Sequence, residues 1–199
     1  MPRQKRKQEL FQTVSHPAFS TAWTGSGAAS TIRIRHAAGQ PSRGWLICGG
    51  RAVPVALGRS GIRANKWEGD GATPRGAFRP VRLWWRADRH VRPRTFMPVR
   101  RLKPEDAWCE DPQSRHYNRP IRRTGTTDGD RLTRADHLYD FIVELDHNTR
   151  PRVARRGSAV FIHLARAGLA PTAGCVALPL PAMRQLLARL GPATRIVIA

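Results

Sequence analysis

The feature that most constrains the fold is a series of short apolar stretches separated by glycine, proline and polar residues. Residues 31–35 alternate polar and apolar side chains, which is the period-2 pattern of a half-buried strand. The sequence predicts further strands at residues 45–48, 52–57, 81–85, 141–145, 158–164, 175–178 and 195–198. The sequence therefore predicts a mainly β fold, and it shows no internal repeat.

Local turn signals refine this prediction. Gly49 and Gly50 supply the positive φ angles that a two-residue hairpin turn needs, so residues 45–48 and 52–57 are expected to pair. Pro54 lacks an N–H group, which predicts an edge position for the second strand.

One helix is predicted, near the C-terminus. Pro181 suits a first turn, and Gly191-Pro192 predicts the end. An apolar stripe between them is made by Met183, Leu186, Leu187 and Leu190.

The chain divides into a tail and one domain. Residues 1–28 are polar and basic and are interpreted as a tail, and residues 29–199 as a single folded domain. Within the domain, residues 86–135 contain 12 arginines and little periodicity. A loop of that length in a compact domain is usually functional or poorly ordered.

The net positive charge of the chain favours polyanionic partners but does not identify one. The 199 residues contain 35 lysines and arginines against 14 acidic residues, a formal net charge of +21. Such a surface attracts polyanions, whether nucleic acid, anionic lipid or an acidic cell-wall polymer. No apolar run approaches the ~18–20 residues of a membrane span. No signal peptide is visible after Arg3, because polar residues interrupt the stretch where ~7–15 apolar residues are needed.

Cysteine chemistry is the strongest catalytic signal. Cys175 follows a turn that ends in Gly174, and His163 lies 12 residues upstream on the preceding predicted strand. If these strands are neighbours, imidazole and thiol meet, and histidine or a positive field can convert a thiol into the nucleophilic thiolate. No Asp or Glu occurs from His147 to Ala199, against eight arginines, so a backbone carbonyl is the expected partner of His163. The alternative is that Cys175 and His163 are buried structural residues.

The remaining cysteines and histidines give weaker signals. Cys48 lies in an apolar strand and is interpreted as core packing, and Cys109 has acidic neighbours that make it a poor nucleophile. The histidines lack zinc-peptidase spacing and no CxxC pair occurs, so no metal site is expected.

Several separated motifs resemble one known family. Ile162-His163 followed by Thr172-Ala-Gly-Cys175-Val resembles the active-site signature of the L,D-transpeptidase catalytic domain, the YkuD family. Thr73-Pro74-Arg-Gly-Ala-Phe78 is similar to an upstream segment of that family, and Tyr117-Asn118 fits one bacterial branch of it. These motifs occur in the family's order over residues 30 to 199.

The resemblance implies a fold, a reaction and a site. The implied fold is a YkuD-like β-sandwich or barrel of mixed sheets with one or more short helices near the C-terminus. The implied reaction is cross-linking of peptidoglycan stem peptides through a thioester, in the periplasm or cell wall, without cofactor or metal. Cys175 is the implied nucleophile and His163 the base, with Gly174 and Thr172 in the oxyanion loop. Tyr117 and Asn118 are expected to contact substrate.

Departures from the family pattern leave alternatives open. Ala173 stands where the family has histidine, and Ala177 where it has Arg or Asn. Alanine supplies neither a donor nor a charge, so the site is expected to hold an amine acceptor less firmly, and hydrolysis by an L,D-carboxypeptidase is the first alternative. The missing signal peptide also favours that alternative and a cytoplasmic location, unless the chain leaves by an unusual route or its start is misassigned. A basic nucleic-acid-binding module is the second alternative, but charge is its only support, so nucleic acid is not the expected partner.

Overall fold

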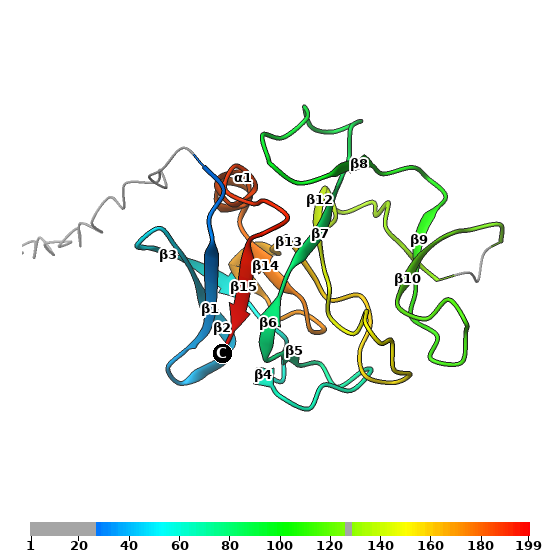
Figure 1. Cartoon of the computed structure of the whole chain (residues 1–199), viewed down its shortest axis with the longest axis horizontal. Coiled ribbons are helices and arrows are strands. Elements are labelled where there is room, and N and C mark those ends of the chain that lie inside the picture. The colour runs from blue at the N-terminus through cyan, green and yellow to red at the C-terminus, as the bar shows by residue number, and fades with distance from the viewer. Residues whose placement is uncertain (1–26, 126–128) are drawn as a thin grey trace, which may run out of the picture.

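The computed structural model describes residues 27–125 and 129–199, so all but the last two residues of the predicted tail lie outside it (Figure 1). Ten strands form one sheet in the order β6-β15-β1-β2-β3-β14-β13-β12-β7-β8. Their bounds are β1 Thr31–Ala37, β2 Gln40–Cys48, β3 Arg51–Ala56, β6 Gly76–Phe78, β7 Pro80–Trp85, β8 Val99–Arg101, β12 Phe141–Leu145, β13 Phe161–Leu164, β14 Val176–Leu178 and β15 Arg195–Ile198.

Two smaller sheets and two helical segments complete the chain. β10 (Arg119–Arg122), β9 (Asp106–Cys109) and β11 (Asp130–Arg131) form a three-stranded sheet in that order. β4 (Ile62–Arg63) pairs with β5 (Thr73–Pro74). The helical segments are the 3₁₀ turn η1 (Ala167–Leu169) and the helix α1 (Leu180–Leu187).

The large sheet is mixed and wraps around one core. β1 and β15, β13 and β14, and β7 and β8 pair in parallel, whereas the other neighbours are antiparallel. Phe78 of β6 and Ile196 of β15, near one end of the strand order, share a buried cluster with Trp85 of β7 and Phe141 of β12, near the other end. A flat sheet could not bring these side chains together, so the sheet must curve around the core. The strands and the α-helix near the C-terminus confirm the predicted mainly β fold of mixed sheets.

The helix is shorter than the sequence predicted. Pro181 lies in its first turn as expected, but regular α-helix ends at Leu187 rather than near Gly191. Single turns continue beyond that point, since the N–H of Leu190 donates to the carbonyl of Leu187 at 3.2 Å.

The predicted hairpin is present, with Gly49 and Gly50 both at positive φ. Its second strand is not the edge of the sheet, because β3 also pairs with β14. The pairing of β3 with β14 is limited to Ala56 and Ala177. Among the described residues, Pro54 therefore has no strand hydrogen-bonded to it on the side facing away from β2, and its missing N–H group is tolerated there.

The described parts of residues 86–135, which are 86–125 and 129–135, contain strands and do not form a single loop. β9 and its partners pack on the face of the large sheet opposite the main core, where a second cluster is buried. Successive side chains along β7 point to opposite faces of the sheet, so β7 contributes to both clusters. Trp85 packs in the main core and Trp84 in the second cluster. Cys175 belongs to this second cluster.

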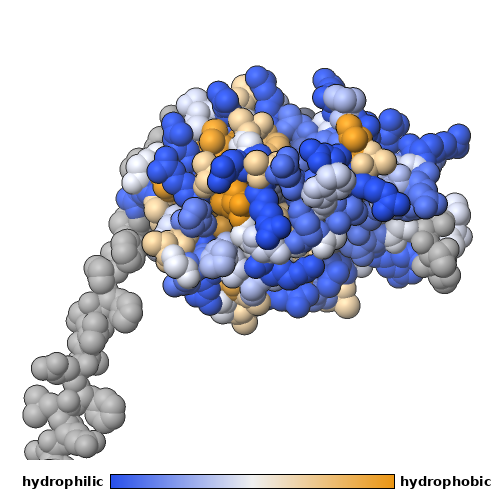
Figure 2. Space-filling view, turned by 90° about the horizontal axis from the view of Figure 1, so that it is seen from below, coloured by the Kyte–Doolittle hydropathy of each residue, from blue (hydrophilic) through white to orange (hydrophobic). Residues whose placement is uncertain are grey.

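Polar side chains cover most of the face drawn in Figure 2, with apolar residues confined to small areas. Among the described residues, no helix is both long and apolar enough to cross a membrane.

Candidate active site

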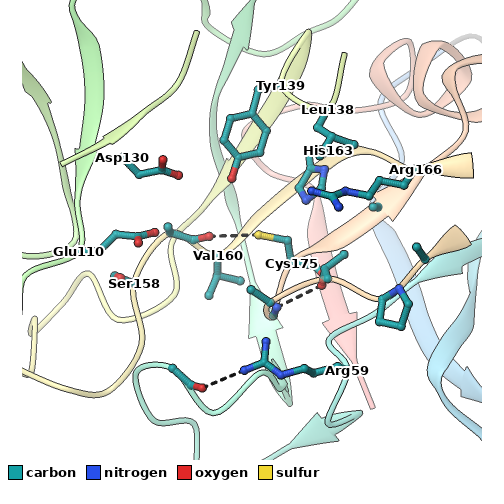
Figure 3. A pocket seen from close by; sticks show the side chains of 18 of the residues that line it. Arg59, Glu110, Asp130, Leu138, Tyr139, Ser158, Val160, His163, Arg166 and Cys175 are labelled. Atoms are coloured by element: carbon teal, nitrogen blue, oxygen red, sulfur yellow. Dashed lines mark hydrogen bonds between the residues drawn. The ribbon is translucent and has the colours of Figure 1, made fainter. Parts of the chain in front are cut away.

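Parallel pairing of β13 with β14 brings the two predicted catalytic residues to one place. The register sets His163 directly beside Ala177, and Cys175 precedes Ala177 by two residues. Side chains two residues apart on a strand point to the same side of the sheet, so Cys175 and His163 share a face. Both line a cavity of about 660 Å³ (Figure 3).

His163 is held by a backbone carbonyl, as the absence of nearby carboxylates in the sequence predicted. Its Nδ1 lies 2.8 Å from the carbonyl oxygen of Leu164. A carbonyl can only accept, so Nδ1 carries the proton and the unprotonated nitrogen is Nε2. Tyr139 packs edge-on against the imidazole, with ring centroids 5.3 Å apart.

Cys175 is a protonated thiol in this structure. Its Sγ donates to the carbonyl oxygen of Ala159 at 3.2 Å, and only 9% of the residue is exposed. Burial raises the pKa of Cys175 to about 12 and lowers the pKa of His163 to about 4. Burial therefore favours the neutral form of both groups, so the thiolate that a nucleophile needs must form as the thiol transfers its proton.

The charges that reach Cys175 differ from those expected. Lys66 is the cation that lowers the pKa of the thiol, but Glu110 and Asp130 raise it. Lys66 is buried, pairs with Asp70 and donates to the carbonyl of Trp67 at 2.9 Å. The arginines near Cys175 in the sequence thus contribute less to its field than residues far away in the chain.

The loop before Cys175 is fixed by two threonines. Thr172 Oγ1 donates to the carbonyl of Cys175 at 2.7 Å and accepts the N–H of Gly174 at 3.1 Å. Thr73 of the upstream motif donates to the same carbonyl at 3.4 Å and accepts the N–H of Gly58 at 2.8 Å. The upstream motif is therefore more than a turn, because it braces the cysteine loop.

Gly174 is required by its backbone conformation. Its φ is +147°, and a Cβ there would lie 2.8 Å from the carbonyl oxygen of Ala72. A side chain at this position would push the cysteine loop away from residues 72–73.

Tyr117 and Asn118 lie behind the cavity and not among the residues that line it. The Tyr117 hydroxyl donates to Glu68. Asn118 Oδ1 accepts the N–H of Ala159 at 3.2 Å, and Ala159 is the residue whose carbonyl holds the thiol. Their expected contact with substrate stays a prediction, whereas their place in the fold is to support the cavity wall.

Three cavity residues carry functional groups that the sequence did not single out for this site. Tyr139 comes from the turn before β12, Glu110 follows β9, and Asp130 begins β11. In the sequence, Glu110 stands out only as an acidic neighbour of Cys109. No local pattern links these residues to Cys175, and only the packing of the small sheet on β12 and β13 brings them there.

No group of three or more His, Cys, Asp or Glu residues in the described part of the chain is arranged to hold a metal ion. Comparison with known proteins gives one finding. The family model for the L,D-transpeptidase catalytic domain, YkuD, matches residues 38–198, whereas no curated protein and no solved structure matches the chain. This match covers most of the described domain and includes both His163 and Cys175. The chain therefore belongs to the YkuD family of L,D-transpeptidase catalytic domains, which act on peptidoglycan.

Proposed function

We propose that the chain is a cysteine-dependent L,D-transpeptidase that acts on peptidoglycan stem peptides through a thioester. The observation that carries this proposal is the shared cavity of Cys175 and His163, in which Nε2 of the imidazole is the available base. Because the polymer lies outside the cytoplasmic membrane, the proposed place of action is the periplasm or the cell wall.

Acylation begins from the neutral pair. The thiol turns from the carbonyl of Ala159 to Nε2 of His163. Sγ then attacks the carbonyl carbon of the diamino acid at the third position of the stem peptide, as Nε2 takes the proton. The C–N bond to the terminal D-alanine then breaks, and His163 returns the proton to the leaving amine. Because the two pKa values disfavour a resting ion pair, proton transfer accompanies the attack.

The tetrahedral intermediate carries a negative oxygen that needs a donor. Thr172 already accepts the N–H of Gly174, so the proposed oxyanion donor is the N–H of Cys175 itself. The role of Thr172 is to fix the loop that presents this donor. One such donor is worth roughly 3–4 kcal/mol in related chemistry.

Hydrolysis is the second candidate outcome for the thioester, and two alanines favour it. Ala177 is buried beside His163 and Ala173 is exposed at the cavity, so neither offers a polar group to an acceptor amine. Measuring cross-linked dimer against trimmed tripeptide, with an amine acceptor present, decides between transferase and carboxypeptidase. Introducing histidine at Ala173, which has space because it is exposed, is expected to raise the dimer share.

Mass spectrometry of the intact protein tests the nucleophile. Incubation with a tetrapeptide stem or a carbapenem-type acylating agent should add one acyl group to the wild type and none to Cys175→Ala. Cys48→Ala and Cys109→Ala are matched controls that should still be acylated, since Cys48 lies in the main core and Cys109 is absent from the cavity lining. Acylation that survives in Cys175→Ala would end the assignment.

A further inference from the structure

Two carboxylates face the nucleophile across the cavity. Glu110 and Asp130 lie on the side that the small sheet contributes, and we call this pair the acidic wall. Figure 3 shows both carboxylates on one side of the cavity, turned toward Cys175 and the hydroxyl of Tyr139. The opposite side is cationic, with Arg166 near His163 and Arg59 below the cysteine loop.

The acidic wall lacks a direct ion pair although the chain is rich in arginine. Elsewhere in the described residues, carboxylates are commonly neutralised by a basic side chain. Ion pairs hold Asp70, Asp88, Asp106, Asp136, Asp140 and Glu144. Neither Glu110 nor Asp130 forms an ion pair with any described residue, although Arg134 and Arg123 lie near enough to Asp130 to lower its pKa.

Placing two carboxylates together without a direct ion pair is unfavourable. Loss of water, together with the charges of Asp130 and Glu68, raises the pKa of Glu110 to about 7. Burial also raises the pKa of Asp130, although Arg134 and Arg123 partly offset this effect. A cation bound between the two carboxylates would relieve the repulsion and hold both in the ionised form.

A third polar group completes the wall. Ser158 lines the same cavity, and only 8% of the residue is exposed. Its hydroxyl is close enough to the Tyr117 hydroxyl to lower the pKa of that group, but within the described residues no partner of Oγ lies at full hydrogen-bond distance. A buried hydroxyl without a partner costs free energy unless a ligand supplies one.

We propose that the acidic wall, together with the Ser158 hydroxyl, binds a primary ammonium group of the substrate. This inference rests on the proposed function, in which a diamino acid is the acyl donor and a second stem amine is the acceptor. A primary ammonium has three N–H donors and one positive charge, which match two carboxylates and one hydroxyl. The arginines across the cavity would repel an ammonium, so they suit the carboxylates of the same stem instead.

Binding to an inactive protein tests the donor's ammonium. The probe is a tetrapeptide stem whose third residue has a free side-chain amine, compared by calorimetry with the same peptide N-acetylated at that amine. In a Cys175→Ala background, Glu110→Gln and Asp130→Asn should each weaken binding of the free amine roughly 10- to 100-fold, as expected for a lost charge-assisted hydrogen bond. Binding of the acetylated peptide should not change. Asp111→Asn is the matched control, because Asp111 follows Glu110 but does not line this cavity.

Partitioning of the thioester tests the acceptor's ammonium. Protein with Cys175 intact is acylated with the N-acetylated donor and then given a stem tripeptide with a free amine. If the acidic wall holds the acceptor, Glu110→Gln lowers the dimer share roughly tenfold while Asp111→Asn does not. A loss in either test supports the inference and identifies which amine is bound. Unchanged affinity and unchanged dimer share in both Glu110→Gln and Asp130→Asn would overturn it. Failure of wild-type acylation would instead overturn the proposed function, since the calorimetry needs no thioester.

Discussion

Replacing Asn118 with alanine should weaken both the fold and the active site, although Asn118 does not line the cavity. Its side chain makes four hydrogen bonds. Oδ1 accepts from Trp108 Nε1 and from the N–H of Ala159, each at 3.2 Å. Nδ2 donates to the carbonyls of His147 at 3.0 Å and Asn148 at 2.9 Å. One residue thus joins β9, the turn after β12 and the backbone at Ala159, whose carbonyl accepts the hydrogen bond of the Cys175 thiol.

The magnitude follows from these contacts. Four hydrogen bonds at a net ~0.5–1.5 kcal/mol each contribute roughly 2–6 kcal/mol to the free energy of unfolding. Asn118 has a φ of +53°, which asparagine tolerates better than alanine, and this adds about 1 kcal/mol. We therefore expect Asn118→Ala to lose about 5 kcal/mol, a large part of the ~5–15 kcal/mol of a typical domain.

Two assays separate the structural loss from the effect on the thiol. Urea unfolding measures the free energy, and acylation of Cys175 is followed by intact mass at a temperature where both proteins are folded. A shift of the Ala159 carbonyl should slow acylation roughly tenfold, because small displacements of reacting groups cost up to ~100-fold in rate.

Asn148→Ala is the control for the Asn118 variant. Asn148 also has positive φ, and it bonds Val153 and Gly157 rather than Ala159. It should lose stability with a smaller effect on acylation. If folded Asn118→Ala is acylated at the wild-type rate, then the hydrogen bond from Ala159 to Asn118 does not affect the reactivity of Cys175.

Three further predictions follow from single residues. Gly174→Ala should cost about 1–3 kcal/mol in urea unfolding and abolish acylation, because its Cβ would meet the Ala72 carbonyl, whereas Gly50→Ala, with positive φ but open space, should leave acylation intact. Stability from neutral His163, whose folded pKa of about 4 is below the ordinary ~6.5, is complete above pH ~6.5 and is lost as the pH falls through 4. The wild type should therefore lose about 3 kcal/mol in this range that His163→Gln does not, and equal losses would contradict the neutral imidazole. Alkylation of Cys175 should have its midpoint near pH 12, and a midpoint below 8 would show a resting thiolate.

Local patterns were sufficient for part of this protein. The strands of the large sheet alternate or form short apolar runs because each packs on the core, and the same burial sets the stripe on α1. The partner of His163 could also be predicted, since the chain after His147 contains no carboxylate. In each case the determining contacts lie within a few residues or between consecutive strands.

The contribution of residues 86–135 could not be predicted in the same way. β9, β10 and β11 are two to four residues long, too short for a period to emerge, and arginine and proline interrupt them. Glu110 and Asp130 reach Cys175 only because Trp108 and Leu132 pack with Phe161 in the second core. Contacts between segments 30 to 65 residues apart leave no signal in a single sequence.

Net charge and site charge also differ in origin, so the charge of the whole chain does not set the pKa of the thiol. A formal charge of +21 describes the whole surface, where salt screens a charge beyond about 8 Å. A buried thiol responds instead to its nearest groups, and there Glu110 and Asp130 oppose Lys66. This difference between long-range surface charge and short-range cavity charge suits a stem peptide, which carries both carboxylates and ammonium groups. Surface arginines can attract the anionic polymer from a distance, while the acidic wall discriminates among its functional groups at contact. A neutral cysteine then has an advantage, because a resting thiolate beside these carboxylates would add a third negative charge to one cavity.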